Sequence, residues 1–355
     1  MLLNLLLLQC RAGFESECAA EFMQHCVDVG QSGFPRFDAQ SGFVLFELYG
    51  DALAVIQAVS FRSLIFTRQW CACLPPFEQL PADDRLSVLL PAMTELPVCA
   101  ELLAEVPDTT AGRELLPFAG KLASAMAQRL RQQGVMLPRK ARADWRMHLF
   151  VLSGRHLLLG VSPRRNGSTL EMGIRRLKFP GAAPSRSTLK LEEAWHWFVP
   201  RAEWDARLGG GKTAVDLGAA PGGWTWQLVR QGMFVSAVDN GPMAESLMET
   251  GQVTHHREDA FGFAPGKPVD WMVCDVADKP ARVAELMLQW ALQGWCQEMI
   301  FNLKLPMKKR YQAVQQCLEE IAEGLEAAGI RFQLSARHLY HDREEITCHL
   351  DLRVS

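Results

Sequence analysis

The pattern of apolar and polar positions changes character along this chain. After about residue 185, short apolar runs alternate with stretches in which apolar residues recur every three or four positions. Strands that alternate with helices are typical of a mostly parallel sheet covered on both faces, a Rossmann-like α/β fold. The pattern predicts strands at Thr213–Leu217, Met233–Val238, Val269–Asp275, Met299–Leu303 and Arg331–Leu334, and helices at Gly223–Arg230, Ala281–Leu292 and Arg310–Ala327. A last apolar run, Ile346–Val354, follows without a helix and predicts an antiparallel edge hairpin.

The first part of the chain follows an α+β pattern instead. Apolar runs such as Leu5–Leu8 alternate with helical stretches up to proline-bearing turns between residues 75 and 91. Further on, an amphipathic helix is predicted at Gly112–Gly134, followed by two strands joined by Ser153-Gly154-Arg155. We therefore expect a small α+β domain over residues 1–80, a second domain over 81–165, a polar linker over 166–184 and the α/β domain over 185–355.

Composition excludes several classes of protein. The chain has 355 residues, of which 48% are hydrophobic and 22% charged, so it is neither disordered nor membrane-embedded in type. The apolar start lacks a basic region and is broken by Arg11, which favours a buried strand over a signal peptide and hence a cytoplasmic protein. The ten cysteines are scattered without a C-x-x-C pair, so we expect buried free thiols and no metal site.

The net charge of −3 hides a strong asymmetry. Residues 111–180 hold 14 basic and 3 acidic side chains, which gives this segment a charge of +11 within an acidic protein. Solvated surfaces usually mix both signs, so a block of one sign predicts contact with a polyanion such as nucleic acid.

The most specific local signal is the run from Asp216 to Trp224, in which a predicted strand enters the turn Gly-Ala-Ala-Pro-Gly-Gly and a helix follows. Ligands of open α/β sheets bind at such turns, where glycines let them approach the backbone. The turn is not G-x-G-x-x-G, and Pro221 lacks the N–H that a pyrophosphate would need. Asp239 ends the next strand, where a carboxylate can accept both ribose hydroxyls of an adenosine. Asp259 follows the next short apolar stretch, where it can meet the adenine amino group.

This ordered set resembles the S-adenosylmethionine site of Rossmann-like methyltransferases, which implies that cofactor. Within that class, the predicted strand Val269–Asp275 ends in Asp275-Val-Ala-Asp-Lys-Pro and not in the Asn/Asp-Pro-Pro-aromatic motif of adenine amino methyltransferases. Cys274 lies inside the apolar strand, so a core role is favoured over that of a base-attacking thiol.

Lys190 stands before the first strand of this domain, Asp275 and Lys304 stand at the ends of two later strands, and a glutamate at 344–345 stands at the start of the last. In such a sheet these positions can converge over the transferred methyl group. Their order resembles the Lys-Asp-Lys-Glu tetrad of the FtsJ-like ribose 2′-O-methyltransferases. Of the two glutamates we select Glu345 over Glu344, because it lies on the face of the last strand opposite Ile346. The resemblance implies that Lys304 is the general base, with a pKa lowered by burial, Lys190 and the cofactor's sulfonium. It also implies cofactor contacts from Ser187, Asp216, Gly218, Ala220, Pro221, Gly222, Gly223, Trp224, Asp239, Asp259 and Asp275.

The first 165 residues resemble a ferredoxin-like unit followed by a THUMP RNA-binding domain. Joined to an FtsJ-like domain, they resemble a bacterial family of 23S rRNA cytidine 2′-O-ribose methyltransferases over essentially the whole chain. This resemblance implies 23S rRNA as partner, contacted by residues 111–180, no membrane, and a monomer. Two alternatives stay open at this point, a nicotinamide-dependent oxidoreductase and a noncatalytic RNA-binding protein with a relic cofactor site.

Overall fold

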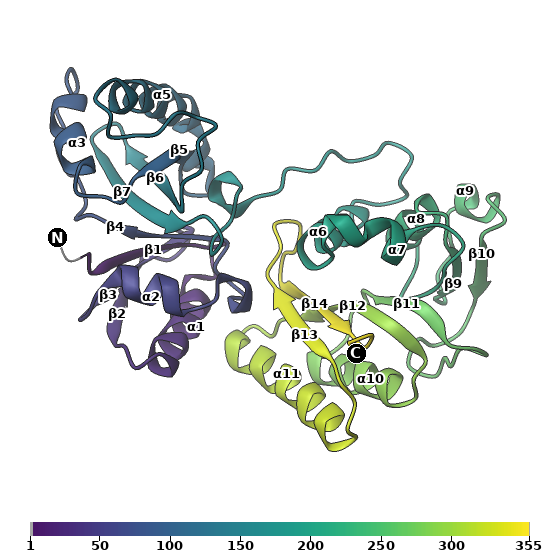
Figure 1. The fold of residues 1–355 in the computed structure, drawn as a ribbon. Coiled ribbons are helices and arrows are strands. Elements are labelled where there is room, and N and C mark those ends of the chain that lie inside the picture. Colours follow the sequence, from purple (N-terminus) through teal and green to yellow (C-terminus); the bar gives the residue numbers. More distant parts are fainter. Residues whose placement is uncertain (1–2, 355) are drawn as a thin grey trace. The chain divides into compact units, whose positions relative to one another are not determined.

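The computed structural model describes residues 3–354. The chain forms two compact units, Met1–Ile174 and Arg175–Ser355, and each is built around one seven-stranded sheet (Figure 1).

The sheet of the first unit is continuous across the domain boundary expected near residue 80. Its strand order is β2-β3-β1-β4-β7-β6-β5. The two halves are joined where β4 pairs antiparallel with β7, through Ala72 opposite Val161. This pairing satisfies two strand edges that would otherwise be open. The strands are β1 (Leu5–Gln9), β2 (Gly33–Arg36), β3 (Phe43–Leu48), β4 (Gln69–Cys73), β5 (Cys99–Glu105), β6 (Trp145–Ser153) and β7 (His156–Pro163).

Two other expectations for this unit differ from the structure. The helix predicted at Gly112–Gly134 is divided at Leu115, because Pro117 stands in the first turn of the second piece, where a proline starts a helix. The expected linker begins later than residue 166, since the side-chain amide of Asn166 donates to the carbonyls of Ile56 and Val59 at 2.7 Å. The helices are α1 (Glu15–Asp28), α2 (Ala52–Ala58), α3 (Leu86–Met93), α4 (Thr110–Glu114) and α5 (Leu116–Gln132).

The second unit confirms the predicted Rossmann-like fold. Its sheet has the order β10-β9-β8-β11-β12-β14-β13, in which β14 lies antiparallel between β12 and β13, and the strands from β10 to β12 are parallel. The strand order reverses between β8 and β11, and ligands of such sheets bind where it reverses. The strands are β8 (Thr213–Leu217), β9 (Phe234–Val238), β10 (Val253–His256), β11 (Val269–Cys274), β12 (Cys296–Lys304), β13 (Gln333–Arg337) and β14 (Glu345–Asp351).

Helices cover both faces of this sheet (Figure 1). On one face, Trp195 and Trp224 from two helices pack with Trp271 of β11 in a buried apolar cluster. On the other face two long helices, α10 and α11, pack against each other, and α10 packs against β12. The helices are α6 (Thr188–Phe198), α7 (Trp204–Leu208), α8 (Gly223–Arg230), α9 (Glu245–Met248), α10 (Pro280–Leu292) and α11 (Arg310–Ala327).

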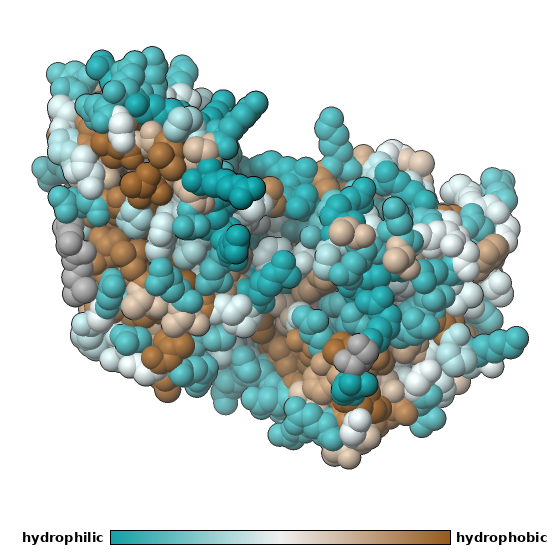
Figure 2. Space-filling model, in the orientation of Figure 1, coloured by the Kyte–Doolittle hydropathy of each residue, from teal (hydrophilic) through white to brown (hydrophobic). Residues whose placement is uncertain are grey.

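Among residues 3–354, no helix combines the length and the apolar character that crossing a membrane requires. Hydrophilic side chains cover much of the visible surface of both units (Figure 2).

Candidate active site

Four side chains from four separate elements form a closed ring of ion pairs at the carboxyl edge of the second sheet. The Lys190 ammonium on α6 lies 3.2 Å from Asp275, which follows β11, and 2.7 Å from Glu345 at the start of β14. The Lys304 ammonium at the end of β12 lies 2.5 Å from Asp275 and 3.0 Å from Glu345. The structure therefore brings together the four residues that the sequence singled out.

Sheet topology explains why residues so far apart in the chain meet here. β14 runs antiparallel to β12, so the start of β14 lies at the edge where β12 ends, and their register places Lys304 directly opposite Glu345. β11 and β12 are parallel neighbours, so Asp275 reaches the same edge.

The pKa of Lys304 in this ring differs from the expectation. Burial lowers the pKa of the Lys304 amine, but Asp275 and Glu345 outweigh that effect and raise the pKa above its ordinary value of 10.5. Burial likewise raises the pKa of Glu345, while Lys190 and Lys304 lower it to about 2. The expected lowering of the pKa of Lys304 is therefore wrong for this arrangement, because two carboxylates face the amine and only one other lysine shares the ring.

The choice between the two adjacent glutamates follows from the same geometry. Glu345 is 7% exposed and contacts both lysines, whereas the Glu344 carboxylate is exposed and accepts a hydrogen bond from Arg310 at 2.7 Å. The structure thus places Glu345, and not Glu344, in the ring.

The turn after β8 is tied to the end of β9 by the Asp239 carboxylate. This group accepts the backbone N–H of Ala220 at 3.0 Å and that of Gly241 at 2.7 Å. A carboxylate offers about four lone-pair sites, so two remain for the two hydroxyls of a ribose. The donor and acceptor set at this position therefore fits the adenosine part of the predicted cofactor.

The glycines of the turn permit close packing and unusual backbone angles. A Cβ on Gly223 would lie 2.1 Å from the Ser187 hydroxyl oxygen, so the start of α6 is pressed against the turn. Gly222 has φ of 111°, in the left-handed region, and Gly218 has φ of 78° next to Val276. The carbonyl of Pro221 accepts the N–H of Ala244 at 3.0 Å, which fixes the far side of the turn.

Two predicted cofactor residues lie beneath the turn. The Trp224 side chain is 2% exposed in the apolar core, and its indole N–H donates to the Ser187 carbonyl at 3.0 Å. Asp216 is 1% exposed, and its carboxylate accepts the Thr225 hydroxyl at 2.6 Å. Burial raises the pKa of Asp216 to about 7, with Asp275 adding to the rise and the Thr225 hydrogen bond opposing it. The side chains of Trp224 and Asp216 therefore support the turn and do not face a ligand.

The other two predicted acidic contacts have different surroundings. Asp259 is exposed after β10, and its carboxylate accepts the N–H of Phe261 at 3.1 Å. The Asp275 carboxylate is held by Lys190, Lys304 and Asn302, whose amide donates to it at 2.9 Å. Asp275 thus belongs to the ring of ion pairs, while Asp259 is exposed outside it.

Sequence reasoning missed a buried polar chain behind Asp275. The Asn302 carbonyl oxygen lies 2.8 Å from the Thr347 hydroxyl, which in turn lies 3.0 Å from both oxygens of Asp342. All three residues are 0% exposed. The sequence did contain a signal for this chain, because Asn302 and Thr347 are polar residues within two otherwise apolar strands, and buried polar groups need partners.

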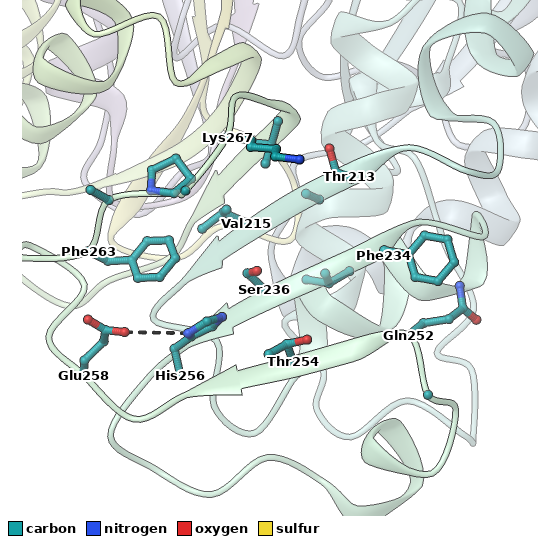
Figure 3. Close-up of a pocket in the computed structure, with 17 residues that line it drawn as sticks. Thr213, Val215, Phe234, Ser236, Gln252, Thr254, His256, Glu258, Phe263 and Lys267 are labelled. Carbon is teal, nitrogen blue, oxygen red and sulfur yellow. Dashed lines mark ion pairs between the residues drawn. The ribbon is translucent and has the colours of Figure 1, made fainter.

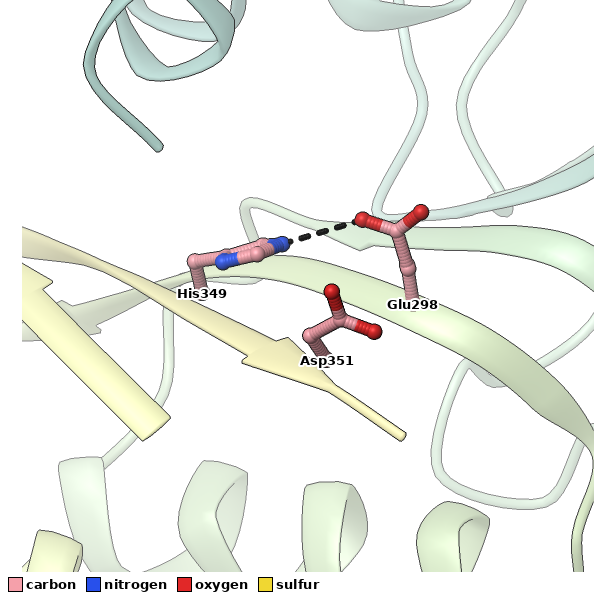
Figure 4. Close-up of side chains that lie close together, drawn as sticks. All are labelled: Glu298, His349 and Asp351. Atoms are coloured by element: carbon pink, nitrogen blue, oxygen red, sulfur yellow. Dashed lines mark hydrogen bonds and ion pairs between the residues drawn. The ribbon is translucent and has the colours of Figure 1, made fainter. Parts of the chain in front are cut away.

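A second carboxylate cluster, formed by Glu298, His349 and Asp351, has the side-chain spacing of a metal site (Figure 4). In this structure Arg207 lies against it and donates to Glu298 and, at 3.1 Å, to Asp351. The guanidinium already supplies the positive charge, so the cluster serves to fasten α7 to the sheet.

A cavity of about 480 Å³ lies on the face of β8, β9 and β10 that carries Val215, Ser236 and Thr254 (Figure 3). His256 and Glu258 form an ion pair of 3.7 Å at its rim. Neither the ring of ion pairs nor the turn after β8 contributes to its lining.

The ten cysteines are buried and free, as predicted. Burial raises the pKa of Cys274 to about 12, so this thiol is not a nucleophile.

In the basic segment, Arg164, Arg165 and Arg176 are exposed, whereas Arg146 is 1% exposed and donates to the Ser168 carbonyl at 2.6 Å. Arg146 is therefore unable to contact a polyanion.

Fold and site together define a methyltransferase of the FtsJ-like class, and the FtsJ-like methyltransferase family model matches residues 183–310. The models for the RlmM ferredoxin-like domain and for the N-terminal part of ribosomal RNA large subunit methyltransferase M match residues 3–71 and 84–163. The chain belongs to the ribosomal RNA large subunit methyltransferase M (RlmM) family. This membership confirms the predicted resemblance and S-adenosylmethionine as cofactor, and it excludes the nicotinamide alternative.

The relatives match along their full length. Ribosomal RNA large subunit methyltransferase M of Vibrio vulnificus (strain CMCP6) is 50% identical over 353 residues, which cover 98% of this chain and 97% of the relative. The same enzyme of Vibrio parahaemolyticus is 51% identical over 350 residues, covering 97% and 98%. Among solved structures, TrmN from Thermus thermophilus matches 98% of this chain and 99% of its own with 17% identity and a TM-score of 0.34, a likeness too distant to add to the family match.

Proposed function

We propose that this protein transfers a methyl group from S-adenosylmethionine to the ribose 2′-hydroxyl of a cytidine in 23S rRNA. The observation that supports it most is the ring formed by Lys190, Asp275, Lys304 and Glu345. The relatives are named as large-subunit rRNA methyltransferases, which supports the substrate class.

A ribose hydroxyl is a weak acid, so its proton must have an acceptor before or during methylation. The cofactor, when bound, supplies the methyl group. In the proposed site Lys304 accepts the proton, Asp275 and Glu345 fix the direction of its amine, and Lys190 holds both carboxylates. Because both carboxylates favour the ammonium form, the amine accepts a proton only in a small neutral fraction.

Cofactor binding is assigned to the turn after β8 and to the acidic residues beyond it. Asp239 accepts the ribose hydroxyls and Asp259 the adenine amino group, while Gly218, Ala220, Pro221, Gly222 and Gly223 line the turn. Ser187 is assigned to the methionine end, since it lies against Gly223.

RNA binding is assigned to the exposed arginines of residues 111–180. Phosphates bind such side chains without reading sequence, so this surface orients the RNA and the catalytic unit selects the nucleotide. We propose that the protein acts as a monomer in the cytoplasm, where its substrate is found.

The test uses purified full-length protein, S-adenosylmethionine with a labelled methyl group, and 23S rRNA from cells that lack this protein. Nucleoside analysis after digestion should give labelled 2′-O-methylcytidine. Label on a base would contradict the proposed reaction, and no label under any condition would favour the noncatalytic alternative. Glu344→Gln, which changes an exposed carboxylate outside the ring, is the matched control and should retain transfer.

A further inference from the structure

The loop between β12 and α11 presents an apolar side chain close to the ring. Its tip consists of Met307, Lys308 and Lys309, and Met307 is 94% exposed. Met307 follows Lys304 by three residues, which span at most about 11 Å, a distance that a few stacked bases cover. Single apolar residues are common on protein surfaces, so exposure alone does not define a site. The surroundings of Met307 must therefore show what it contacts.

Both ends of this loop are fastened to the catalytic unit. The N–H of Leu305 donates to the carbonyl of Glu344 at 2.8 Å. The Arg310 guanidinium donates to the carbonyl of Pro306 at 3.4 Å and to the Glu344 carboxylate at 2.7 Å. Pro306 also fixes one backbone angle immediately before the tip. The tip is therefore presented to solvent on a fixed base.

The tip carries positive charge beside its apolar side chain. Lys308 and Lys309 are both exposed, and Arg310 begins α11 directly after them. Lys309 has φ of 54° and ψ of 40°, a left-handed conformation that is costly for a lysine, so the chain keeps a cation here at the expense of backbone strain. Exposed lysines bind phosphates without reading sequence, so the partner that fits this tip is a polyanion.

The ring itself is recessed, and this sets a requirement for an RNA substrate. Its four side chains are only 10–25% exposed. A nucleotide within a base stack is held in line with its neighbours, so it must leave the stack before its ribose can enter a recessed site. Proteins that open a base stack often insert an apolar side chain, such as methionine, between the bases. Met307 has the character, the exposure and the place in the chain that this task needs.

We propose that Met307 enters the base stack of the RNA next to the target nucleotide and keeps that nucleotide turned out toward the ring, while Lys308 and Lys309 hold the adjacent phosphates. Met307 is a positioning residue, because it contacts the RNA and not the reacting atoms. This proposal rests on the proposed function, since the nucleotide that it positions is the one that is methylated. Met307 determines how much of the bound RNA has its ribose in place, and the two lysines determine how tightly the RNA binds.

Single-turnover methylation by the full-length protein, with saturating cofactor and 23S rRNA from cells that lack this protein, tests the role of Met307. Met307→Ser should lower the rate about 10- to 100-fold, because a base step must then be opened without an inserted apolar side chain. Its affinities for RNA and S-adenosylmethionine should persist. Met307→Leu is the matched control, since it keeps a large apolar side chain, and it should retain most of the rate. A wild-type rate for Met307→Ser, or a rate for Met307→Leu as low as that of Met307→Ser, would overturn the proposal.

The two lysines are tested by a double variant. Lys308→Gln combined with Lys309→Asn removes both charges, and asparagine tolerates the left-handed backbone at position 309. This variant should weaken RNA binding and flatten its salt dependence, while the rate at saturating RNA stays close to that of the wild type. An unaltered salt slope would overturn the assignment of phosphates to this tip.

Photocrosslinking gives a second readout that needs no activity. The full-length protein carrying p-benzoylphenylalanine at position 307 is irradiated with the same 23S rRNA, and primer extension maps the crosslinked nucleotide. The crosslink should lie beside the cytidine whose methylation depends on the protein. The same photoreactive residue in place of Phe234, which is exposed at the start of β9 on the opposite edge of the sheet, should not crosslink there.

No crosslink from position 307, or one far from the methylated cytidine, would overturn the proposal. If position 307 crosslinks to one site of the RNA but the wild type transfers no methyl group, the proposed function has failed and the contact of this loop with RNA has not.

Discussion

Replacing Lys304 separates proton acceptance from charge stabilisation at the proposed site. Lys304→Arg keeps a cation beside Asp275 and Glu345, but a guanidinium stays protonated at any workable pH. Loss of a general base typically lowers the rate by about 10²–10⁴-fold. We therefore expect Lys304→Arg and Lys304→Ala to lose methyl transfer to this extent while cofactor and RNA affinities persist.

The raised pKa of Lys304 gives this prediction a pH dependence. An ordinary lysine with a pKa of about 10.4 is neutral to roughly one part in 1,000 at pH 7.5, and Lys304, whose pKa is raised, is neutral to a smaller extent. Asp275 and Glu345 raise the pKa further, so the neutral fraction grows about tenfold per pH unit throughout the range from 6.5 to 8.5. The single-turnover rate of the wild type should rise with pH in the same proportion.

The assay is single-turnover methylation at saturating RNA across that pH range. A slope near tenfold per unit in the wild type, absent from the residual activity of Lys304→Ala, is the expected result. A flat wild-type profile together with near wild-type rates for Lys304→Arg would refute the reasoning. Lys304 would then position groups electrostatically, and the base would have to be Lys190 or Asp275.

Three further predictions address the cofactor, the ring and the RNA surface. Asp239→Ala should weaken S-adenosylmethionine binding by about 1.5–3 kcal/mol in calorimetry, because charge-assisted hydrogen bonds are lost, and an unchanged affinity would contradict the assigned contact. Glu345→Gln should lower the pKa of Lys304 and move the rising limb of the pH–rate profile toward lower pH, whereas Glu344→Gln should leave it in place; equal effects would refute the choice of Glu345. Replacing Arg164, Arg165, Arg175 and Arg176 with alanine should weaken RNA binding and flatten its salt dependence in titrations at several salt concentrations, with cofactor affinity intact, and an unaltered salt slope would mean that this surface does not bind phosphates.

The second unit was largely predictable because its elements are strongly periodic. Thr213–Leu217, Gly223–Arg230 and Arg310–Ala327 have the same bounds in the structure as in the sequence prediction. β10, only four residues long, was too short to produce a pattern. In the first unit, the pairing of β4 with β7 depends on contacts between distant residues, which local periodicity does not report.

The candidate site shows the same division between local and nonlocal information. Asp275, Lys304 and Glu345 could be selected because each stands at the end or the start of a predicted strand, and Lys190 because the order of the four residues resembles the FtsJ-like tetrad. Their protonation could not be predicted, because it depends on how many carboxylates face each amine. The burial of Trp224 and the chain behind Asp275 likewise depend on packing between elements that are distant in sequence.

The most direct test of the account maps methylation in the 23S rRNA of cells that lack this protein and are complemented with either wild type or Lys304→Arg. A 2′-O-methyl group blocks alkaline cleavage next to its nucleotide, so its position can be mapped along the RNA. The account predicts one cytidine that is protected by the wild type and unprotected both without the protein and with Lys304→Arg. Protection of that cytidine by Lys304→Arg, or no cytidine that depends on the protein, would contradict it.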